Sequence, residues 1–224
     1  MSIRNQIDIF YNMISEKIII WDWNGTLLND AETCLVTMNN ILGRRNMPGL
    51  TLELYKEVFS FPVIEYYQKI GFDFSKESFE ALSVEFIDAY NQALGSAPLV
   101  RNAEKILEYF KKAGKENVII SAMKSDMLKK SVAEKGIESY FTNILGIENI
   151  YAASKSKLAT DYVKKRSLDV DDIVLIGDTT HDYEVAREIG CRCILVADGH
   201  QSEERLRTAG VEIIPVLTDL LTAF

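Results

Sequence analysis

The sequence lacks the features of secreted and membrane-spanning proteins. It contains only three cysteines, which form neither a paired framework nor a zinc-like spacing: Cys34, Cys191 and Cys193. We therefore expect reduced thiols. The longest apolar run near the start, residues 18–21, is far too short to cross a bilayer, and the residues before it have no signal-peptide core. These features predict a cytoplasmic protein with no membrane partner.

Basic residues are too few for a broad nucleic-acid surface. The 224-residue chain has 25 Lys and Arg residues against 33 Asp and Glu residues, which gives a formal net charge of -8. Binding to a phosphate backbone needs clustered Lys and Arg, so we expect no nucleic-acid partner. A small anionic substrate is compatible with this charge, because a bound metal can reverse the field inside one cleft.

The pattern of apolar residues divides the chain into a helical part and an alternating part. Residues 2–14 have near-helical spacing, and residues 17–22 are typical of a buried strand. Residues 31–95 show helical periodicity with breaks, which predicts three or four helices. From about residue 99, helices and strands alternate. Helices are expected at 102–113, 125–135, 157–166, 182–189, 203–209 and after 214, and strands at 117–121, 143–145, 173–177, 191–197 and 211–214.

This order of elements predicts an α/β fold. Strands that alternate with helices form a parallel sheet covered on both faces. We expect a Rossmann-like core of residues 1–30 and 97–224, with a helical cap of residues 31–96 inserted after the first strand.

Polar side chains follow three of the predicted strands. Asp22, Ser121 and Asp178 stand where apolar strands end, and Asp182 comes one helical turn after Asp178. Ligands of open parallel sheets bind at this carboxyl edge. Three carboxylates gathered there would need a cation, and their hard oxygen atoms favour Mg²⁺. Each residue taken singly has an ordinary structural interpretation as a turn, a helix cap or an exposed helix start.

A phosphate site also needs a positive side chain, and two lysines are candidates. Lys155 and Lys157 both stand at the start of the helix that precedes the strand at 173–177. The amino end of that helix would add backbone donors to the same anion site.

Three segments resemble the motifs of the haloacid dehalogenase-like superfamily. Asp22-Trp23-Asn24-Gly25-Thr26-Leu27 is similar to its first motif, Asp-x-Asp-Gly-Thr-Leu, and Ile119-Ile120-Ser121 to its second. Gly177-Asp178-Thr179-Thr180-His181-Asp182 is similar to its fourth, Gly-Asp-x-x-x-Asp. The order and separation of the motifs match over nearly the whole chain. The helical insertion resembles the α-helical cap of phosphoglycolate phosphatase-like members.

This resemblance implies a magnesium-dependent phosphatase that acts on a small phosphorylated substrate. Asp22 would be the nucleophile. The ion would be held by Asp22, the backbone carbonyl of Asn24 and Asp178, with support from Asp182. Phosphate would be bound by Ser121, Lys155, Gly25 and Thr26. The family spacing favours Lys155, which lies 23 residues before Asp178, over Lys157, which lies 21 before it.

Asn24 departs from the family pattern, because phosphatases of this family carry an Asp there as general acid and base. An amide cannot deliver a proton and take one back, and losing that help typically costs ~10²–10⁴-fold in rate. We favour a slow or specialised phosphatase, in which the substrate or a cap residue supplies the proton. His181, which stands inside the fourth motif, is a further proton-donor candidate, although a lone histidine in a loop is more often structural or exposed. The alternatives are a phosphonate hydrolase-like enzyme, with Lys56 as a candidate Schiff-base lysine, and a metabolite-binding protein with little turnover.

The predicted cap should choose the substrate. Its aromatic stretch contains Phe59, Phe61, Tyr66 and Tyr67. Most of these are expected in the core of the cap, with one or two residues from the turn at 60–62 facing the substrate. Asp198-Gly199 is interpreted first as a turn. These patterns determine neither the oligomeric state nor the substrate.

Overall fold

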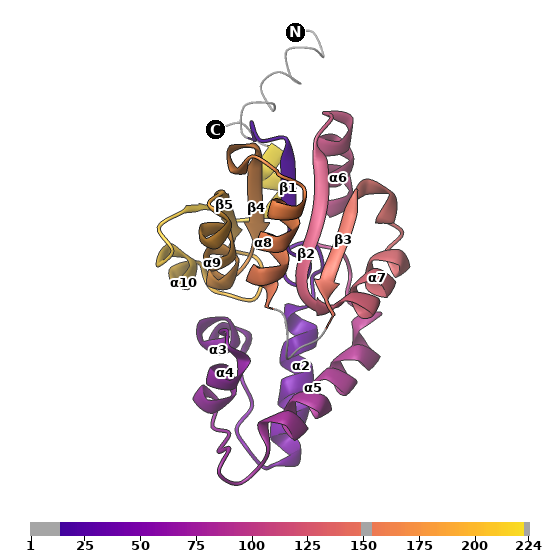
Figure 1. The fold of residues 1–224 in the computed structure, drawn as a ribbon. Coiled ribbons are helices and arrows are strands. Elements are labelled where there is room, and N and C mark those ends of the chain that lie inside the picture. The colour runs from indigo at the N-terminus through magenta and orange to yellow at the C-terminus, as the bar shows by residue number, and fades with distance from the viewer. Residues whose placement is uncertain (1–13, 149–153, 222–224) are drawn as a thin grey trace.

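The computed structural model describes residues 14–148 and 154–221, so the helix expected at residues 2–14 falls almost wholly outside the described residues. The centre of the fold is a parallel sheet in the strand order β3-β2-β1-β4-β5-β6 (Figure 1). Its strands are β1 (Ile18–Trp21), β2 (Glu116–Lys124), β3 (Asn143–Ile147), β4 (Ile173–Gly177), β5 (Arg192–Val196) and β6 (Glu212–Ile214). The predicted Rossmann-like α/β fold with a parallel sheet is confirmed.

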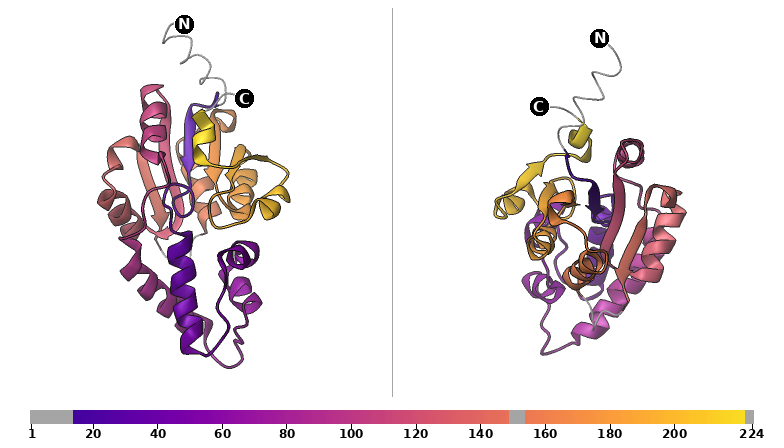
Figure 2. Two further views of the ribbon diagram at one scale, coloured as in Figure 1. Left: turned by 180° about the vertical axis from the view of Figure 1, so that it is seen from behind. Right: turned by 45° about the horizontal axis from the view of Figure 1, so that its top comes forward.

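Helices cover both faces of this sheet (Figure 2). Successive strand residues point to opposite faces, so Ile19 and Trp21 enter one apolar cluster, and Ile18 and Ile20 enter another. The first cluster includes residues of α6 (Ala103–Lys112), α7 (Ser125–Glu134) and the 3-10 helix η3 (Leu217–Leu221). The second includes residues of α8 (Lys155–Lys165), α9 (Thr180–Ile189) and α10 (Glu203–Arg207).

Four helices follow β1 and lie beyond the carboxyl end of the sheet (Figure 1). They are α2 (Ala31–Arg44), α3 (Leu52–Val58), α4 (Val63–Lys69) and α5 (Phe79–Leu94). Residues of these helices form an apolar cluster of their own, which includes Met38, Tyr55, Tyr67 and Leu82. That separate cluster supports the division into a core of residues 1–30 and 97–224 and a cap of residues 31–96, which stays our proposal.

The ends of several elements differ from the expected ones because of local hydrogen bonds. Helix α8 begins at Lys155, two residues early, since the Ser154 side chain accepts a hydrogen bond from the Lys157 backbone N–H. Helix α9 begins at Thr180 behind a capping box between Thr179 and Asp182. The helix expected after residue 214 is the short η3. Within the described part of the chain, no helix has the length and apolar character needed to span a membrane.

Candidate active site

The sheet brings Asp22, Ser121 and Asp178 to one edge, although the prediction that Ser121 ends its strand was wrong: β2 continues past it to Lys124, whereas Asp22 and Asp178 directly follow β1 and β4. Trp21, the last residue of β1, pairs with Ile119 of β2 on one side and Ile176 of β4 on the other. Asp22, Ser121 and Asp178 therefore follow this row within two residues, on three adjacent strands. The Asp22 N–H also donates to the Ile176 carbonyl at 2.9 Å, which continues the ladder into the loop.

Three carboxylates form a buried cluster at this edge. Asp22, Asp178 and Asp182 each offer a carboxylate oxygen, and these oxygens lie within 4.8 Å of one another. Their exposed fractions are 8%, 0% and 1%. The ammonium of Lys155 is buried among them: it lies 2.5 Å from Asp22 Oδ1 and also pairs with Asp182 Oδ1. Lys155 therefore pairs with two of the three carboxylates.

Burial and this pairing set the acidity of the cluster. Burial raises the pKa of Asp22 to about 7, although Lys155 opposes the rise, and it raises the pKa of Asp178 to about 6. Burial is also the largest single effect on Asp182, but the charge and hydrogen bond of Lys155 together with the Thr179 hydrogen bond outweigh it and hold the pKa below its ordinary value. The cluster thus resists carrying three negative charges by itself. A hard divalent cation such as Mg²⁺ fits this all-oxygen donor set and supplies the missing positive charge.

Neighbouring donors fix the orientation of two of these carboxylates. Asp178 accepts from the Thr26 hydroxyl at 2.9 Å and from the His200 backbone N–H at 2.6 Å. Asp182 accepts from the backbone N–H and hydroxyl of Thr179, at 3.0 Å and 2.6 Å. Thr26, predicted to bind phosphate, therefore has its hydroxyl on Asp178. Partners of this kind hold ligands in place at metal sites.

The loop after β1 approaches the cluster so closely that one position requires glycine. Gly25 has a φ of +74°, and a Cβ there would lie 2.2 Å from Asp178 Oδ2 and 2.5 Å from the His200 ring. Such a position tolerates no side chain. Gly25 was predicted to help bind phosphate, and in the structure the groups that it approaches are Asp178 and His200.

Asn24 is tethered away from the carboxylate cluster by two residues that sequence analysis missed. Its Nδ2 donates to Asp30 Oδ2 at 2.9 Å and to the Tyr90 hydroxyl at 2.8 Å, and Tyr90 in turn donates to Asp30 at 2.6 Å. Burial is the largest single effect on the pKa of Asp30 and would raise it, but the His200 charge together with hydrogen bonds from His200, Tyr90 and Asn24 outweighs burial and lowers that pKa. An ionised carboxylate only accepts hydrogen bonds, so the amide NH₂ of Asn24 must face Asp30.

The remaining predicted residues separate into buried and exposed ones. Ser121 is buried, and its hydroxyl oxygen accepts from the Met123 N–H at 3.1 Å. Lys157 is exposed and pairs with Asp161 one turn along its own helix. His181 lies 3.0 Å from Glu184 and packs its ring on Phe61. Lys56 lies 3.5 Å from the carbonyl of Asp198. Of the two candidate lysines, only Lys155 contacts the acidic cluster.

The aromatic stretch of the helical insertion meets the loop after β5. Tyr66 and Tyr67 are buried within the helical cluster, whereas Phe59 packs on the His200 ring at 5.1 Å. The Phe59 carbonyl accepts from Gln201 Nε2 at 3.0 Å and from Arg205. This junction places residues 59–61 beside the loop that borders the acidic cluster.

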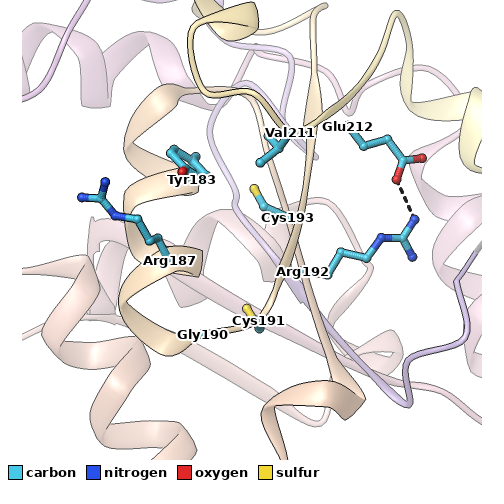
Figure 3. A pocket seen from close by; sticks show the side chains of 8 residues that line it. All are labelled: Tyr183, Arg187, Gly190, Cys191, Arg192, Cys193, Val211 and Glu212. Carbon is cyan, nitrogen blue, oxygen red and sulfur yellow. Dashed lines mark hydrogen bonds and ion pairs between the residues drawn. The ribbon is translucent and has the colours of Figure 1, made fainter.

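A pocket of about 480 Å³ lies elsewhere, at the amino ends of β5 and β6 (Figure 3). It is lined by Tyr183, Arg187, Gly190, Cys191, Arg192, Cys193, Val211 and Glu212. An ion pair between Arg192 and Glu212 crosses its rim at 2.6 Å. None of the clustered carboxylates lines it, so the candidate chemistry lies at the opposite edge of the sheet. All three cysteines are free, as predicted.

Comparison with known proteins places this geometry in a family. The family model for the haloacid dehalogenase-like hydrolases matches residues 19–196. The chain belongs to that family. Among curated relatives, the phosphoglycolate phosphatase of Caulobacter vibrioides is 25% identical over 203 residues, covering 88% of this chain and 85% of the relative. The phosphoglycolate phosphatase of Vibrio parahaemolyticus is 20% identical over 208 residues, covering 88% and 91%.

Solved structures show the same fold. A haloacid dehalogenase-like family protein from Streptococcus pneumoniae has a TM-score of 0.76 at 17% identity, covering 89% of this chain and 93% of its own. A protein described as a predicted phosphoglycolate phosphatase from Haemophilus somnus has a TM-score of 0.73 at 18% identity, covering 94% and 98%. The predicted family and the predicted enzyme class, a phosphoric monoester hydrolase of this type, are confirmed.

Proposed function

We propose that this haloacid dehalogenase-like hydrolase is a magnesium-dependent phosphatase that acts on a small phosphorylated metabolite through an aspartyl-phosphate at Asp22. The observation that carries the proposal is the buried group of Asp22, Asp178 and Asp182 around Lys155. No membrane or nucleic-acid partner is part of the proposal. We also place the protein in the cytoplasm, which agrees with its free cysteines.

In the proposed reaction, a carboxylate oxygen of Asp22 attacks phosphorus, and the bond from phosphorus to the leaving oxygen breaks. Water then attacks the phosphorus of the aspartyl-phosphate and releases phosphate, which restores Asp22. Lys155 and Ser121 would hold the transferring oxygens, where negative charge must be offset. Gly25 would allow close approach of the loop, and Thr26 would orient Asp178.

Magnesium would be held by Asp22, the Asn24 carbonyl and Asp178, with Asp182 in support. When bound, Mg²⁺ offsets the negative charge of the phosphoryl group and of the attacking carboxylate. The Thr26 hydroxyl and the His200 N–H keep Asp178 turned toward this position.

Asn24 bears on the class of substrate. Its NH₂ group faces Asp30 and Tyr90, and an amide cannot supply a proton to the leaving oxygen. The proposed substrates therefore have a good leaving group or carry their own proton donor. The names of the curated relatives make phosphoglycolate, a small phosphorylated acid, the first compound to assay. A phosphonate hydrolase mechanism through Lys56 is not favoured, because the Lys56 ammonium is exposed and lies 3.5 Å from the Asp198 carbonyl.

The direct test is Mg²⁺-dependent release of phosphate from p-nitrophenyl phosphate, whose leaving group needs little protonation. We expect Asp22→Asn to abolish turnover, since the amide is a poor nucleophile, while the circular dichroism spectrum stays unchanged. Asp126→Asn is the matched control, because Asp126 is an exposed residue of α7. Turnover that persists in Asp22→Asn would refute the proposed nucleophile.

A further inference from the structure

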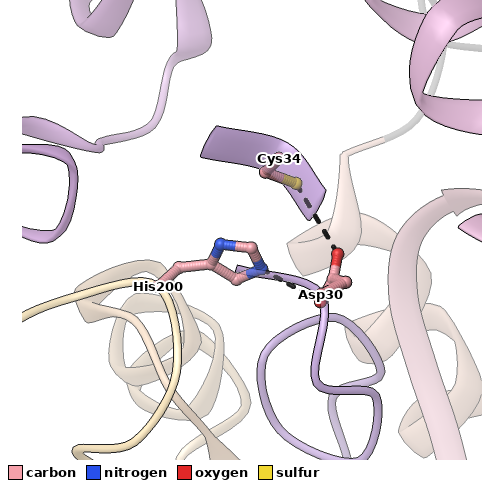
Figure 4. A group of neighbouring side chains, drawn as sticks. All are labelled: Asp30, Cys34 and His200. Carbon is pink, nitrogen blue, oxygen red and sulfur yellow. Dashed lines mark hydrogen bonds and ion pairs between the residues drawn. The ribbon is translucent and has the colours of Figure 1, made fainter. Parts of the chain in front are cut away.

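A second group of metal-ligating side chains lies beside the proposed active site (Figure 4). Asp30 immediately precedes α2, Cys34 follows one turn later on that helix, and His200 comes from the loop after β5. One ligand atom from each residue can be chosen so that all lie within 4.8 Å of one another. Sequence spacing did not predict this group, because His200 is far from the other two in the chain.

Two of the separations within this group are close to the edge lengths of a tetrahedral zinc site, although they end on different oxygens of Asp30. His200 Nε2 lies 3.3 Å from Asp30 Oδ1, and Cys34 Sγ lies 3.7 Å from Asp30 Oδ2. Bonds of about 2.0–2.1 Å to nitrogen or oxygen and about 2.3 Å to sulfur place neighbouring ligands about 3.3–3.6 Å apart in a tetrahedron. These two distances lie within a few tenths of an ångström of those values, and the three ligand atoms lie within 4.8 Å of one another, so binding would draw them together around the ion.

The groups behind these ligands are also those that a metal site requires. The second ring nitrogen of His200, Nδ1, lies 2.7 Å from the Tyr55 hydroxyl, which fixes the ring. The Asp30 carboxylate is held by the Gly25 N–H at 2.8 Å and the Tyr90 hydroxyl at 2.6 Å. Metal-bound histidine and carboxylate ligands have such outer partners as a rule.

The donor set and its burial indicate which metal would bind. Sulfur, imidazole and carboxylate together suit Zn²⁺, whereas the oxygen cluster of Asp22, Asp178 and Asp182 suits Mg²⁺. Asp30 and His200 are almost fully buried, but Cys34 is only partly buried. Three protein ligands leave the fourth position of a tetrahedron open.

We infer that Asp30, Cys34 and His200 form a binding site for a thiophilic divalent cation of the Zn²⁺ class. In the structure Asp30 and His200 pair with each other; metal binding would replace that pairing, and the protons of the Cys34 thiol and of the His200 ring nitrogen would be released to solvent. Bound metal would link the first turn of α2 to the loop after β5. It would also engage the carboxylate that holds Asn24 and Gly25.

Cobalt(II) is the probe for this site, because a thiolate bound to Co²⁺ gives a charge-transfer band in the near ultraviolet. The full chain, stripped of metal, is titrated with CoCl₂ in excess MgCl₂, which occupies oxygen-only sites. We expect one Co²⁺ per chain with this band, displaced by Zn²⁺. Cys34→Ser should remove the band. Cys191→Ser and Cys193→Ser, the matched controls, should keep it.

Three results would overturn the site: no band in the unmodified chain, a band that survives in Cys34→Ser, or a band that disappears in Cys193→Ser instead. A second measurement needs no variant. Zn²⁺ in excess Mg²⁺ should slow alkylation of Cys34 by N-ethylmaleimide at least ~10-fold, as read by peptide mass spectrometry. An unchanged Cys34 alkylation rate would also refute the inference.

A functional consequence rests on the proposed phosphatase activity. Zn²⁺ added to the magnesium-loaded enzyme should inhibit phosphate release, and Cys34→Ser should lose that inhibition. The Co²⁺ band and the alkylation rate do not depend on turnover, so failure of the metal site and failure of the phosphatase proposal remain distinguishable.

Discussion

The Lys155 ammonium lies 2.5 Å from Asp22 Oδ1 and also pairs with Asp182, so a single buried cation joins the proposed nucleophile to the end of the fourth motif. Burial lowers the pKa of Lys155, but Asp182 and Asp22 outweigh that effect and raise it above its ordinary value. The lysine therefore stays charged where a phosphoryl group would arrive.

Lys155→Met should lower kcat/KM for p-nitrophenyl phosphate by about 10²–10³-fold, because it removes the positive side chain facing the transferring oxygens. Lys157→Met is the matched control. Lys157 is two residues away on the same helix and pairs with Asp161 in solvent, so its loss should change kcat/KM less than about twofold. Steady-state kinetics on both variants checks this. A larger loss in Lys157→Met would reverse the assignment of the phosphate lysine.

The parallel sheet and the acidic cluster could both be predicted from the sequence. The apolar runs that end in Asp22 and Asp178 specify buried parallel strands, and parallel strands bring their carboxyl ends to one edge. The choice of Lys155 over Lys157 came from the family spacing, and the contact of Lys155 with Asp22 and Asp182 supports it. Lys155 stands at the start of α8 because the Ser154 side chain caps the helix there.

The surroundings of Asn24 could not be predicted from the sequence. Tyr90 reaches Asn24 from the last turns of α5, and His200 reaches Asp30 from the loop after β5. These contacts depend on how the inserted helices sit against the sheet. Neither local propensity nor motif spacing carries that information.

Metal removal should destabilise the protein, because three buried carboxylates within 4.8 Å of one another then lose the positive charge of the ion. Mg²⁺ at about 100 times its Kd should stabilise the folded state by about 2.7 kcal/mol, which corresponds to a rise in Tm of about 5–10 °C for a chain of this size. Asp178→Asn should weaken Mg²⁺ binding more than about 10-fold and reduce that rise. Asp126→Asn, at an exposed position of α7, should keep the full rise in Tm. Thermal unfolding with EDTA and with Mg²⁺ provides the measurement; an equal rise in Asp178→Asn and the unmodified chain would contradict the metal site.

Asn24→Asp should raise the rate on an alkyl phosphate by about 10²-fold relative to p-nitrophenyl phosphate, because it restores an acid that can protonate the leaving oxygen. The new carboxyl would lie beside buried Asp30, now 2.9 Å from the Asn24 amide. Two such groups cannot both ionise readily, so one keeps its proton. The ratio of the two rates measures the effect, and Asn24→Ala should not raise it. An unchanged ratio in Asn24→Asp would show that position 24 does not face the leaving group.

Gly25→Ala should cost stability and activity together. At a φ of +74° an alanine is strained by about 1–2 kcal/mol, and its Cβ would overlap Asp178 Oδ2 at 2.2 Å. We expect the Tm to fall by several degrees, and Mg²⁺-dependent turnover to fall because Asp178 must move. Gly43→Ala is the matched control: it lies in α2 with no atom within 4 Å of the added Cβ, so it should stabilise the helix by about 0.5–1 kcal/mol. Calorimetry gives the Tm of both variants, and a phosphate-release assay gives their turnover. A normal Tm and normal activity in Gly25→Ala would disprove the close approach of this loop to Asp178.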